Sequence, residues 1–503
     1  MRYSFSYQCI RELPKLTWLA QVDRSTGKVT AYCGSKVEQH PDFLVAGVWD
    51  APFVEAGFDV SDVFYGTGAK LKDNGVMFVT PSHSMERLLL HENKERITVS
   101  NSFPFLLEFI HAGLDRTVYD YENILCSMLN GPGGIKDIPV SGGEVIRQFV
   151  VSNITVTDNE IIVTRRPSME PFADYNDYYA RITGSLCAVK ANLSAAERSS
   201  HFGMVATISS GYDSTACAAL ARTIGCDCVV TLKGGQYDSD NGLTAAKALG
   251  YRHIESRDKL LYKRSTDSIE AMYLCNGELG TELQFSVFDD LTAGCLVFLG
   301  SRGSYWNKSY EVTEDFEMKG YYFFETGVSY TEDALKNGSI YIPLPAFGAS
   351  VCNSIKRISN SDEMKPWSVG GDYDRPIPRR IAETAGVPRE AFGMKKYGGG
   401  FSFCYDNMRR IRGKMSESGY ASFLGFRKSG KGVKKGLKRL RYLRKYDRDT
   451  YPIYLNAAFG RLRIPIRLKQ KPNACVNPGA PADLIFWGVD VMKKRYAEAM
   501  NQV

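Results

Sequence analysis

Alternating hydrophobic and polar positions dominate the first third of the chain. Short runs rich in β-branched and aromatic residues are separated by Asp, Gly, Asn and Pro, a pattern typical of half-buried strands joined by turns. The runs are Trp18–Val22, Val29–Cys33, Val76–Thr80, Ile97–Ser100 and Ile161–Thr164. The pattern therefore predicts a β-rich region over residues 1–165.

Beyond residue 200 the pattern changes to short apolar runs that alternate with helical segments. Val205–Ile208 has the composition of a buried strand, and the small residues Ser209–Ser214 that of a tight turn. The Ala-rich stretch Thr215–Ile224 is predicted to be a helix that Gly225 ends. This order of strand, turn and helix is the beginning of a parallel α/β unit.

Further strands follow at intervals that suit the same architecture. Asp240 is expected to cap the N-terminus of a helix that separates two of them. The predicted strands are Cys228–Leu232, Tyr251–Glu255 and Cys295–Leu299. Strands joined through helices by short loops imply right-handed crossovers and a parallel sheet, with ligands at the carboxyl ends of the strands.

The segment around residues 167–178 is rich in Pro, Asp, Tyr and Asn, so we place a linker there. After it Tyr179–Asn192 is predicted to be helical, and Ser194 with Glu197 has the spacing of a capping box that would begin a second short helix. The chain is thus divided into a β-rich domain (1–165), a linker and helix (166–195), an α/β domain (196–408) and a C-terminal extension (409–503).

The C-terminal extension is basic and mostly helical by pattern. Ten of its Lys and Arg residues lie between Arg427 and Lys445, and without them the net charge of +7 would be about −3. Apolar residues in this stretch follow one face of a helix, so a solvated helix is the simpler interpretation and nucleic-acid binding through 427–445 the less favoured one. An amphipathic helix from Pro481, with Trp487 in the core, is predicted to close the chain.

Composition excludes several classes of protein. Hydrophobic residues make up 44% and charged residues 24% of the 503 positions, as in soluble globular proteins. No apolar segment is long enough to span a bilayer, and the sequence has no secretory leader, so we expect a cytoplasmic protein. The 12 cysteines are scattered without zinc or redox spacing, and we expect reduced, mostly buried thiols.

The turn Ser209–Ser214 carries the first candidate chemistry. Small residues let the backbone approach an anion, and the amides at the start of the following helix point toward it. Asp213 in this turn could hold a magnesium ion that bridges phosphate oxygens. An ordinary tight connection between a strand and a helix is the alternative.

The order of residues in this turn resembles a known signature. Ser209-Ser210-Gly211-Tyr212-Asp213-Ser214 is similar to the Ser-Gly-Gly-x-Asp-Ser motif of the PP-loop ATP pyrophosphatases, which cleave ATP between its α and β phosphates; only Ser210 departs from it. A second stretch, from Ser239 to Glu255, resembles in its spacing the segment that follows the ATP loop in asparagine synthetases. In that family the backbone at the end of the second strand, here near Leu232, holds the adenine.

A third turn resembles the same family in its glycine and serine positions but differs from it at an acidic position. Gly300-Ser301-Arg302-Gly303-Ser304-Tyr305-Trp306 stands where asparagine synthetases have Ser-Gly-Glu-Gly-Ser-Asp-Glu, whose amides bind pyrophosphate. Arg302 replaces the first Glu, and it could clamp a phosphate or a substrate carboxylate. The segment Ile342–Phe347 resembles the part that lines the substrate, and Lys395 or Lys396 resembles the lysine that contacts the transferred phosphates.

The β-rich domain resembles, weakly, a glutaminase domain of the Ntn-hydrolase type in the stretch from His91 to Leu107. Such domains use an N-terminal cysteine whose free amine is the general base. Position 2 is Arg2, and the first cysteine is Cys9, which has no free amine beside it. If the domain is related, it should be inactive as a glutaminase.

The resemblance implies the fold and the reaction together. The fold expected is α/β, with a parallel-sheet PP-loop domain of the HUP-like, adenine nucleotide alpha hydrolase type behind a degenerate glutaminase-like domain. The activity expected is that of an asparagine-synthetase-like ligase, in which ATP and magnesium activate a small-molecule carboxylate as an acyl-adenylate and ammonia or an amine then forms an amide.

The site residues expected for this reaction divide into three roles. Ser209, Ser210, Gly211, Tyr212, Ser214, Leu232, Ser301 and Gly303 would contact ATP, Asp213 would hold magnesium, and Arg302 with Lys395 or Lys396 would stabilise charge during the reaction. Two alternatives are considered. The protein could be a PP-loop enzyme that modifies bases in nucleic acids, or a non-catalytic member of the family that binds nucleotides or acts as a scaffold. The protein could also form a homodimer.

Overall fold

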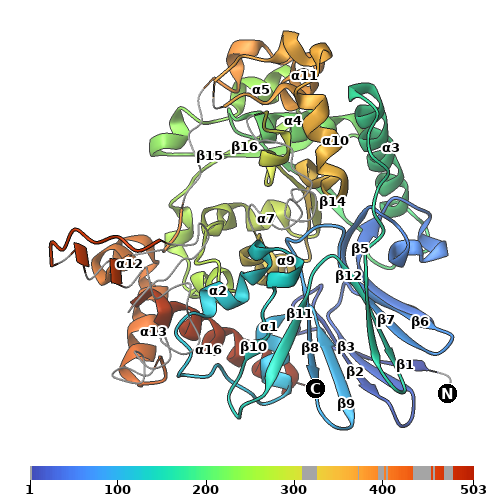
Figure 1. Cartoon of the computed structure of the whole chain (residues 1–503), viewed down its shortest axis with the longest axis vertical. Helices are drawn as coiled ribbons and strands as arrows, with labels where there is room; N and C mark the ends of the chain where they lie inside the picture. The colour runs from blue at the N-terminus through green and yellow to red at the C-terminus, as the bar shows by residue number, and fades with distance from the viewer. Residues whose placement is uncertain are drawn as a thin grey trace.

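In the computed structural model, the described residues form three β-sheets (Figure 1). The structure describes residues 3–308, 326–371, 373–394, 401–403, 406–433, 455–456, 459–460, 462–469 and 480–502. Two largely antiparallel sheets lie in the N-terminal region, and a five-stranded parallel sheet follows. The prediction of an α/β chain with a β-rich N-terminal region is confirmed.

The first N-terminal sheet has the strand order β1-β3-β2-β9-β8-β11-β10. All of its pairs are antiparallel except β1 with β3. The strands are β1 (Ser4–Cys9), β2 (Trp18–Asp23), β3 (Lys28–Cys33), β8 (Leu88–Glu92), β9 (Arg96–Ser100), β10 (Ile138–Pro139) and β11 (Val145–Phe149).

The second N-terminal sheet has the order β13-β12-β7-β6-β5-β4, and its pairs are antiparallel. Its strands are β4 (Glu38–Gln39), β5 (Phe43–Trp49), β6 (Phe64–Lys72), β7 (Gly75–Val79), β12 (Ser152–Thr157) and β13 (Ile161–Arg165). All five strands predicted for this region are therefore confirmed, within one or two residues at their ends.

Alternation along the strands brings the two sheets together as layers. Trp18 of β2 stacks on Phe78 of β7 with ring centroids 6.2 Å apart, and its indole N–H donates to Thr67 Oγ1 of β6 at 2.9 Å. Trp18 and Phe78 are both fully buried. A Trp can be buried this completely because its one polar atom has found a partner.

The third sheet is parallel throughout, in the order β16-β15-β14-β17-β18. Its strands are β14 (Gly203–Thr207), β15 (Cys228–Lys233), β16 (His253–Asp258), β17 (Cys295–Leu299) and β18 (Ile340–Pro343). Since β14 occupies the centre, the turns that follow β14, β15 and β17 meet at one edge of the sheet. The parallel sheet and the predicted strands are confirmed, although β16 begins at His253 rather than Tyr251.

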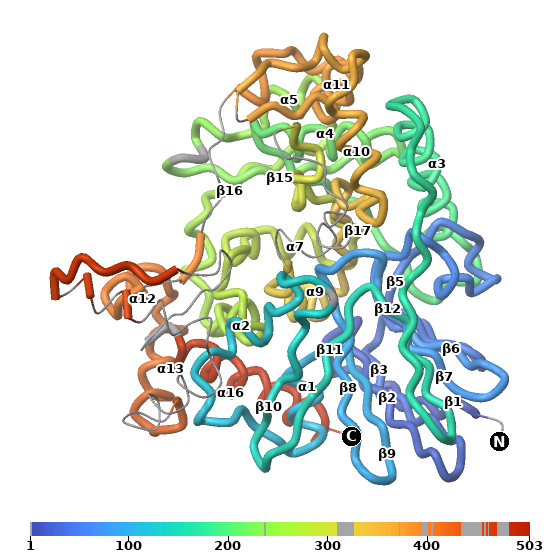
Figure 2. Tube along the Cα trace, in the orientation of Figure 1, coloured from blue at the N-terminus to red at the C-terminus, as the bar shows by residue number. Residues whose placement is uncertain are grey.

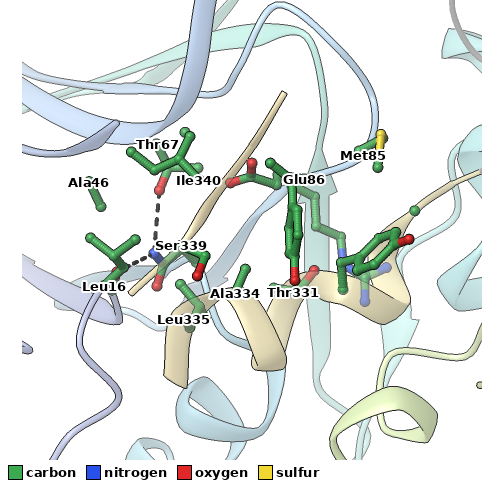
Figure 3. Close-up of a pocket in the computed structure, with 16 residues that line it drawn as sticks. Leu16, Ala46, Thr67, Met85, Glu86, Thr331, Ala334, Leu335, Ser339 and Ile340 are labelled. Atoms are coloured by element: carbon green, nitrogen blue, oxygen red, sulfur yellow. Dashed lines mark hydrogen bonds between the residues drawn. The ribbon is translucent and has the colours of Figure 1, made fainter. Parts of the chain in front are cut away.

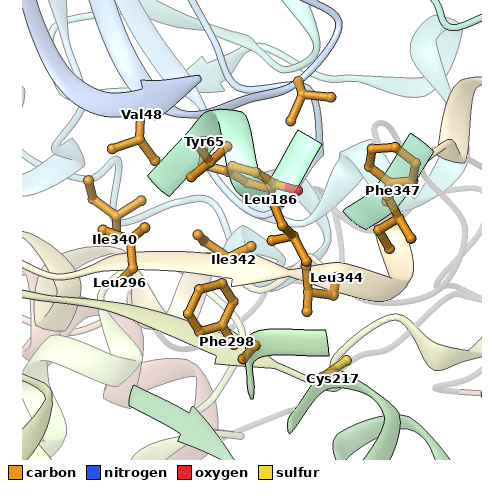
Figure 4. Packing of buried hydrophobic residues seen from close by; sticks show 14 of the residues in the cluster. Val48, Tyr65, Leu186, Cys217, Leu296, Phe298, Ile340, Ile342, Leu344 and Phe347 are labelled. Carbon is orange, nitrogen blue, oxygen red and sulfur yellow. The ribbon is translucent and has the colours of Figure 1, made fainter. Parts of the chain in front are cut away.

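One apolar core joins the parallel sheet to the N-terminal layers. Val48 of β5 and Tyr65 of β6 belong to the same buried cluster as Leu296 of β17 and Ile342 of β18 (Figure 4). Leu186 of helix α3 packs into this cluster as well. The parallel sheet is thus held against the β-rich region by apolar burial rather than by a few surface contacts.

The helices cover the parallel sheet and the outer face of the first N-terminal sheet, as the trace in Figure 2 shows. Those described are α1 (Phe103–Phe109), α2 (Tyr121–Leu125), α3 (Tyr175–Leu193), α4 (Tyr212–Thr223), α5 (Leu243–Ala248), α6 (Glu270–Leu274), α7 (Asp289–Thr292), α9 (Thr331–Asn337), α10 (Cys352–Ser359), α11 (Pro376–Thr384), α12 (Met408–Lys414), α13 (Glu417–Lys428) and α16 (Ala480–Met500).

Several predicted helix starts are wrong; α4, for example, begins at Tyr212 rather than Thr215. Helix α5 begins at Leu243 and follows Gly242, because the carboxylate of Asp240 accepts the hydroxyl of Ser210 instead of capping the helix. Ser194 does not begin a helix; it follows the end of α3, and no helix is assigned between residues 194 and 202. Helix α3 itself begins four residues earlier than predicted, since Asp174 accepts the backbone N–H of Asp177.

The closing helix is confirmed as α16, which packs against α1 and α6. Trp487 is fully buried, and its indole N–H donates to Ser422 Oγ at 3.0 Å. Within the described residues no helix combines the length and the apolar character that crossing a membrane requires.

A buried polar network ties α9 and α16 to the N-terminal region. The carboxylate of Glu332 in α9 accepts hydroxyls from Ser102, before α1, and from Tyr496, in α16, at 2.8 and 2.7 Å. Arg87, next to β8, donates to Gln148 Oε1 at 2.7 Å and to Asn276 Oδ1 at 3.0 Å. Desolvation raises the pKa of Glu332 to about 7.

Glu332→Gln should remove a pH dependence of stability. The pKa of Glu332 is about 7 in the folded state and 4.5 when unperturbed. Between pH 4.5 and pH 7 the folded state therefore binds one more proton than the unfolded state, and the free energy of unfolding falls as the pH rises through this range. Glutamine imitates the protonated carboxyl. The variant should match wild type near pH 5 and exceed it near pH 8 by up to ~3 kcal/mol in the free energy of unfolding.

Denaturant unfolding at the two pH values measures this difference. Glu160→Gln is the matched control, because Glu160 is exposed at a strand turn and should show no pH-dependent difference from wild type. An equal effect of Glu332→Gln at both pH values would contradict the assigned titration.

Candidate functional site

The turn between β14 and α4 is closed by its own serines. Ser214 Oγ accepts the backbone N–H of Ser209 at 3.0 Å and lies 2.8 Å from Ser209 Oγ. Ser209 Oγ in turn accepts the N–H of Gly211 at 3.1 Å. The backbone N–H groups of Ser209 and Gly211 therefore donate to serine hydroxyls in this structure. If a phosphate bound here, it would accept these N–H groups in place of the hydroxyls, and the two hydroxyls could rotate to donate to it.

A second turn presses against the start of α4. A Cβ atom built on Gly303 would lie 1.9 Å from Asp213 Cγ, and one on Gly300 would lie 2.5 Å from the backbone nitrogen of Ser214. Only glycine allows these approaches. The turn holding Ser301 and Gly303 thus adjoins the turn holding Asp213.

Asp213 lies in the first turn of α4 and forms an ion pair with Arg375. Arg375 is only 6% exposed and stacks over the ring of Tyr373 at 5.3 Å. The sequence analysis missed Arg375, because an arginine just before a Pro-rich helix has no local signal of its role. The structure therefore adds a cation that faces the carboxylate predicted to hold magnesium.

A metal site at Asp213 would depend on the nucleotide. In the described part of the chain no group of three or more His, Cys, Asp or Glu side chains could hold a metal. Magnesium suits this arrangement nonetheless, because it is often bound by one or two carboxylates together with substrate phosphates and water.

The side chain of Tyr212 belongs to the core, although the sequence placed it among the nucleotide contacts. It is fully buried; its hydroxyl accepts from Arg379 at 2.8 Å, and the guanidinium of Arg379 lies 4.8 Å from its ring. The rings of Tyr373 and Phe392 lie 4.8 and 6.0 Å away. Tyr212 thus joins α4 to α11, and only its backbone remains near the turn.

Ser210, the one departure from the motif, has a structural partner. Its hydroxyl donates to Asp240 Oδ1 at 2.7 Å, and its carbonyl accepts the N–H of Gly393 at 2.6 Å. The chain that leads to the predicted lysines thus passes beside the turn, but Lys395 and Lys396 themselves lie outside the described residues.

Leu232 lies near the end of β15, at the same edge of the sheet as the turn after β14. Its side chain is 4% exposed and packs in an apolar cluster. Any contact with a nucleotide would therefore come from its backbone, as the resemblance implies.

The side chain of Arg302 reaches the segment that begins at Thr326. It is 3% exposed, and its guanidinium donates to the carbonyl of Thr326 at 3.1 Å. Its backbone has φ = +73°, an uncommon conformation for a residue other than glycine. Three predicted site residues that the structure describes have side chains outside the turns: Tyr212 and Leu232 pack in apolar clusters, and Arg302 donates to Thr326.

A buried lysine that the sequence analysis missed supports the second turn. Lys356 of α10 is fully buried, and its ammonium donates to the carbonyls of Ser304 and Asn307 at 3.0 and 2.5 Å. Desolvation lowers its pKa to about 7. The sequence did contain a signal for this lysine: it stands beside Ile355 among the apolar positions of a helix, where a lysine is unusual.

A small cavity lies where the N-terminal layers meet α9 and β18 (Figure 3). It offers about 20 Å³ to a water-sized molecule, and its polar groups include the carboxyl of Glu86 and the hydroxyl of Thr331. This volume is enough for about one water molecule. The cavity is separate from the turns around Asp213, since none of their residues lines it.

Comparison of this chain with family models and with curated proteins finds no match. The assignment of function consequently depends on the residue motifs and on the contacts between them.

Gly303→Ala should destabilise the fold through Asp213. The added methyl group would overlap the carboxylate, and overpacking of this kind typically costs ~1–3 kcal/mol. Because the overlap is with the carboxyl group itself, Gly303→Ala should cost less in an Asp213→Ala background. Unfolding free energies of the four proteins in this cycle measure the coupling.

Gly184→Ala is the matched control. Gly184 lies on the exposed side of α3, where an added methyl group meets nothing within 4 Å, and the substitution should stabilise the protein by ~0.5–1 kcal/mol. If Gly303→Ala proves equally harmless, the close contact between the two turns is wrong.

Proposed function

We propose that the protein is an ATP-dependent carbon–nitrogen ligase of the asparagine-synthetase type, built on a PP-loop domain. The observation that carries this proposal is the contact of the Gly300–Gly303 turn with the start of α4 at Asp213, at the carboxyl ends of the adjacent strands β14 and β17. Open parallel sheets bind ligands outside the carboxyl ends of their strands. The two turns match, in order, two anion-binding segments of that family.

In this proposal the two turns share the phosphates of ATP. Backbone amides and hydroxyls from Ser209, Gly211 and Ser214 bind pyrophosphate on one side, and amides from Ser301 and Gly303 bind it on the other. Asp213 would hold magnesium, which neutralises phosphate charge, and Arg375 adds a fixed positive charge beside it. Lys395 or Lys396 would approach from the segment that follows Gly393.

The reaction requires little covalent chemistry from the protein. A substrate carboxylate held in line with the α-phosphate attacks it, pyrophosphate leaves, and ammonia or an amine attacks the acyl-adenylate and releases AMP. Positioning and electrostatic stabilisation can supply most of the acceleration. The nitrogen would come from free ammonia, a partner or an amine of the substrate, because Cys9 is an internal residue of β1 and has no free α-amine that could serve as a general base.

Nucleic-acid modification is less well supported. Of the basic stretch 427–445 only residues 427–433 are described, and there Arg427 pairs with Asp483 and Lys431 with Asp490 of α16. These basic residues contact the protein's own C-terminal helix. We further propose that the enzyme is soluble and cytoplasmic and that it has no glutaminase activity of its own.

Purified protein with ATP, magnesium, ammonia and a cell extract as a pool of acceptors should release AMP and pyrophosphate. Asp213→Asn keeps the shape of the side chain but removes the charge that holds magnesium, so turnover should fall at least ~100-fold. Coupled pyrophosphate release and chromatography of the nucleotides measure both products.

Asp227→Asn is the matched control for this experiment. Asp227 also pairs with arginines, Arg222 and Arg252, but it precedes β15 at the opposite edge of the sheet, so its loss should leave turnover unchanged. Release of ADP and phosphate in place of AMP and pyrophosphate would exclude the PP-loop chemistry.

A further inference from the structure

Cys9 and Cys33 stand opposite each other in neighbouring strands. β1 and β3 run parallel (Figure 1), and their register pairs Cys9, the last residue of β1, with Cys33, the last residue of β3. The backbone N–H of Ile10 donates to the carbonyl of Cys33 at 2.9 Å, so the strands remain paired at this position. Paired strands lie about 4.8 Å apart, within the Cα separation of about 4.4–6.8 Å that disulfides require.

The two side chains share one face of the sheet. Ala31 and Cys33 of β3 are buried in the apolar core, and Tyr7, the β1 residue opposite Ala31, packs against the same core. Side chains alternate along a strand, so Cys9, two residues after Tyr7, lies on the side of the sheet that Tyr7 occupies. The sulfur atoms of Cys9 and Cys33 are therefore on the same side of adjacent strands, as a bond between them requires.

The two thiols differ in accessibility. Cys9 is exposed, whereas Cys33 is fully buried. Burial raises the pKa of the Cys33 thiol, and the neighbouring Cys9 raises it further. Thiolates rather than thiols attack disulfides, and access limits their reaction. A dissolved disulfide therefore reacts with Cys9 first, and Cys33 reacts afterwards with the sulfur that lies beside it.

We propose that Cys9 and Cys33 form a disulfide when a small disulfide such as glutathione disulfide oxidises the protein. The thiolate of Cys9 attacks one sulfur of glutathione disulfide, and one glutathione leaves as its thiolate. The thiolate of Cys33 then attacks the sulfur of Cys9 in this mixed disulfide and releases the second glutathione. Two electrons pass from the cysteines to glutathione disulfide, and the two thiol protons end on the two glutathione molecules.

The bond would fix an edge strand of the first N-terminal sheet. Within the described residues β1 ends its sheet and pairs with β3 alone. Tyr7 connects β1 to the second sheet, since its hydroxyl donates to the carbonyl of His40, directly after β4, at 2.6 Å. A disulfide between Cys9 and Cys33 restricts the unfolded chain and so holds β1 in place. Reducing compartments keep such pairs open, so the bond would form in response to oxidation.

Exposure of the full-length protein to glutathione disulfide tests the proposal without ATP or an acceptor, so the outcome is independent of the proposed ligase activity. After the remaining thiols are blocked, proteolysis under non-reducing conditions and mass spectrometry should find a peptide pair joined through Cys9 and Cys33. Cys33→Ser should stop at glutathione bound to Cys9, and Cys9→Ser should give neither product at these positions. The bond is read in the wild-type protein, so the result does not depend on either variant folding.

Cys187→Ser is the matched control. Cys187 of α3 is also exposed, so glutathione should bind it, but its substitution should leave the bond between Cys9 and Cys33 unchanged. The proposal is overturned if Cys9 of wild type retains glutathione as in Cys33→Ser, or if the bond appears only after the protein has been denatured.

The rate of bond formation tests the order of the two steps. The mixed disulfide is prepared at low pH, freed of glutathione and moved to higher pH, where Cys33 must ionise before it attacks. Because the raised pKa keeps the Cys33 thiol mostly protonated, the rate should rise about tenfold per pH unit between about pH 7 and pH 9. A rate that levels off in this range would contradict a buried attacking thiol.

Thermal unfolding measures the consequence for β1. In the Cys187→Ser background the oxidised protein should have a Tm at least ~2 °C above that of the reduced protein, since the bond restricts the unfolded chain. Adding Cys9→Ser should remove this difference. A lower Tm on oxidation would show that the native register does not accommodate the bond.

Discussion

The backbone at Gly303 passes so close to the Asp213 carboxylate that no side chain fits between them. This single approach requires β17 to lie next to β14 in the parallel sheet, with α4 starting directly after the turn. It also depends on the support beneath the second turn, where Lys356 binds the carbonyls of Ser304 and Asn307. The candidate site is therefore a product of sheet order and close packing rather than of one motif.

Charges inside the molecule follow one principle, that burial must be matched by a partner. Asp213 has Arg375, and Glu332 has the hydroxyls of Ser102 and Tyr496 and gains a raised pKa. Arg302 is the exception among these, since a carbonyl is its only described partner.

The sequence predicted the strands better than the helix starts. Alternating and continuous apolar runs located the strands of β2, β3, β14, β15 and β17 within one or two residues, because side-chain periodicity is a local property. Asp240 was misplaced as a helix cap because its carboxylate could equally accept from Ser210, thirty positions earlier in the chain. A capping motif shows which hydrogen bonds a side chain could form, but the tertiary structure determines which partner it has.

The sequence by itself determined the α/β class, the parallel sheet and the small-residue turns at Ser209–Ser214 and Gly300–Gly303, since each depends on residues adjacent in the chain. Only the tertiary structure decided that Asp213 faces Arg375, that Tyr212 turns into the core beside Arg379, and that Arg302 donates to the carbonyl of Thr326. The first two of these contacts join side chains that lie 162 and 167 positions apart in the chain, and no local pattern encodes contacts at such separations.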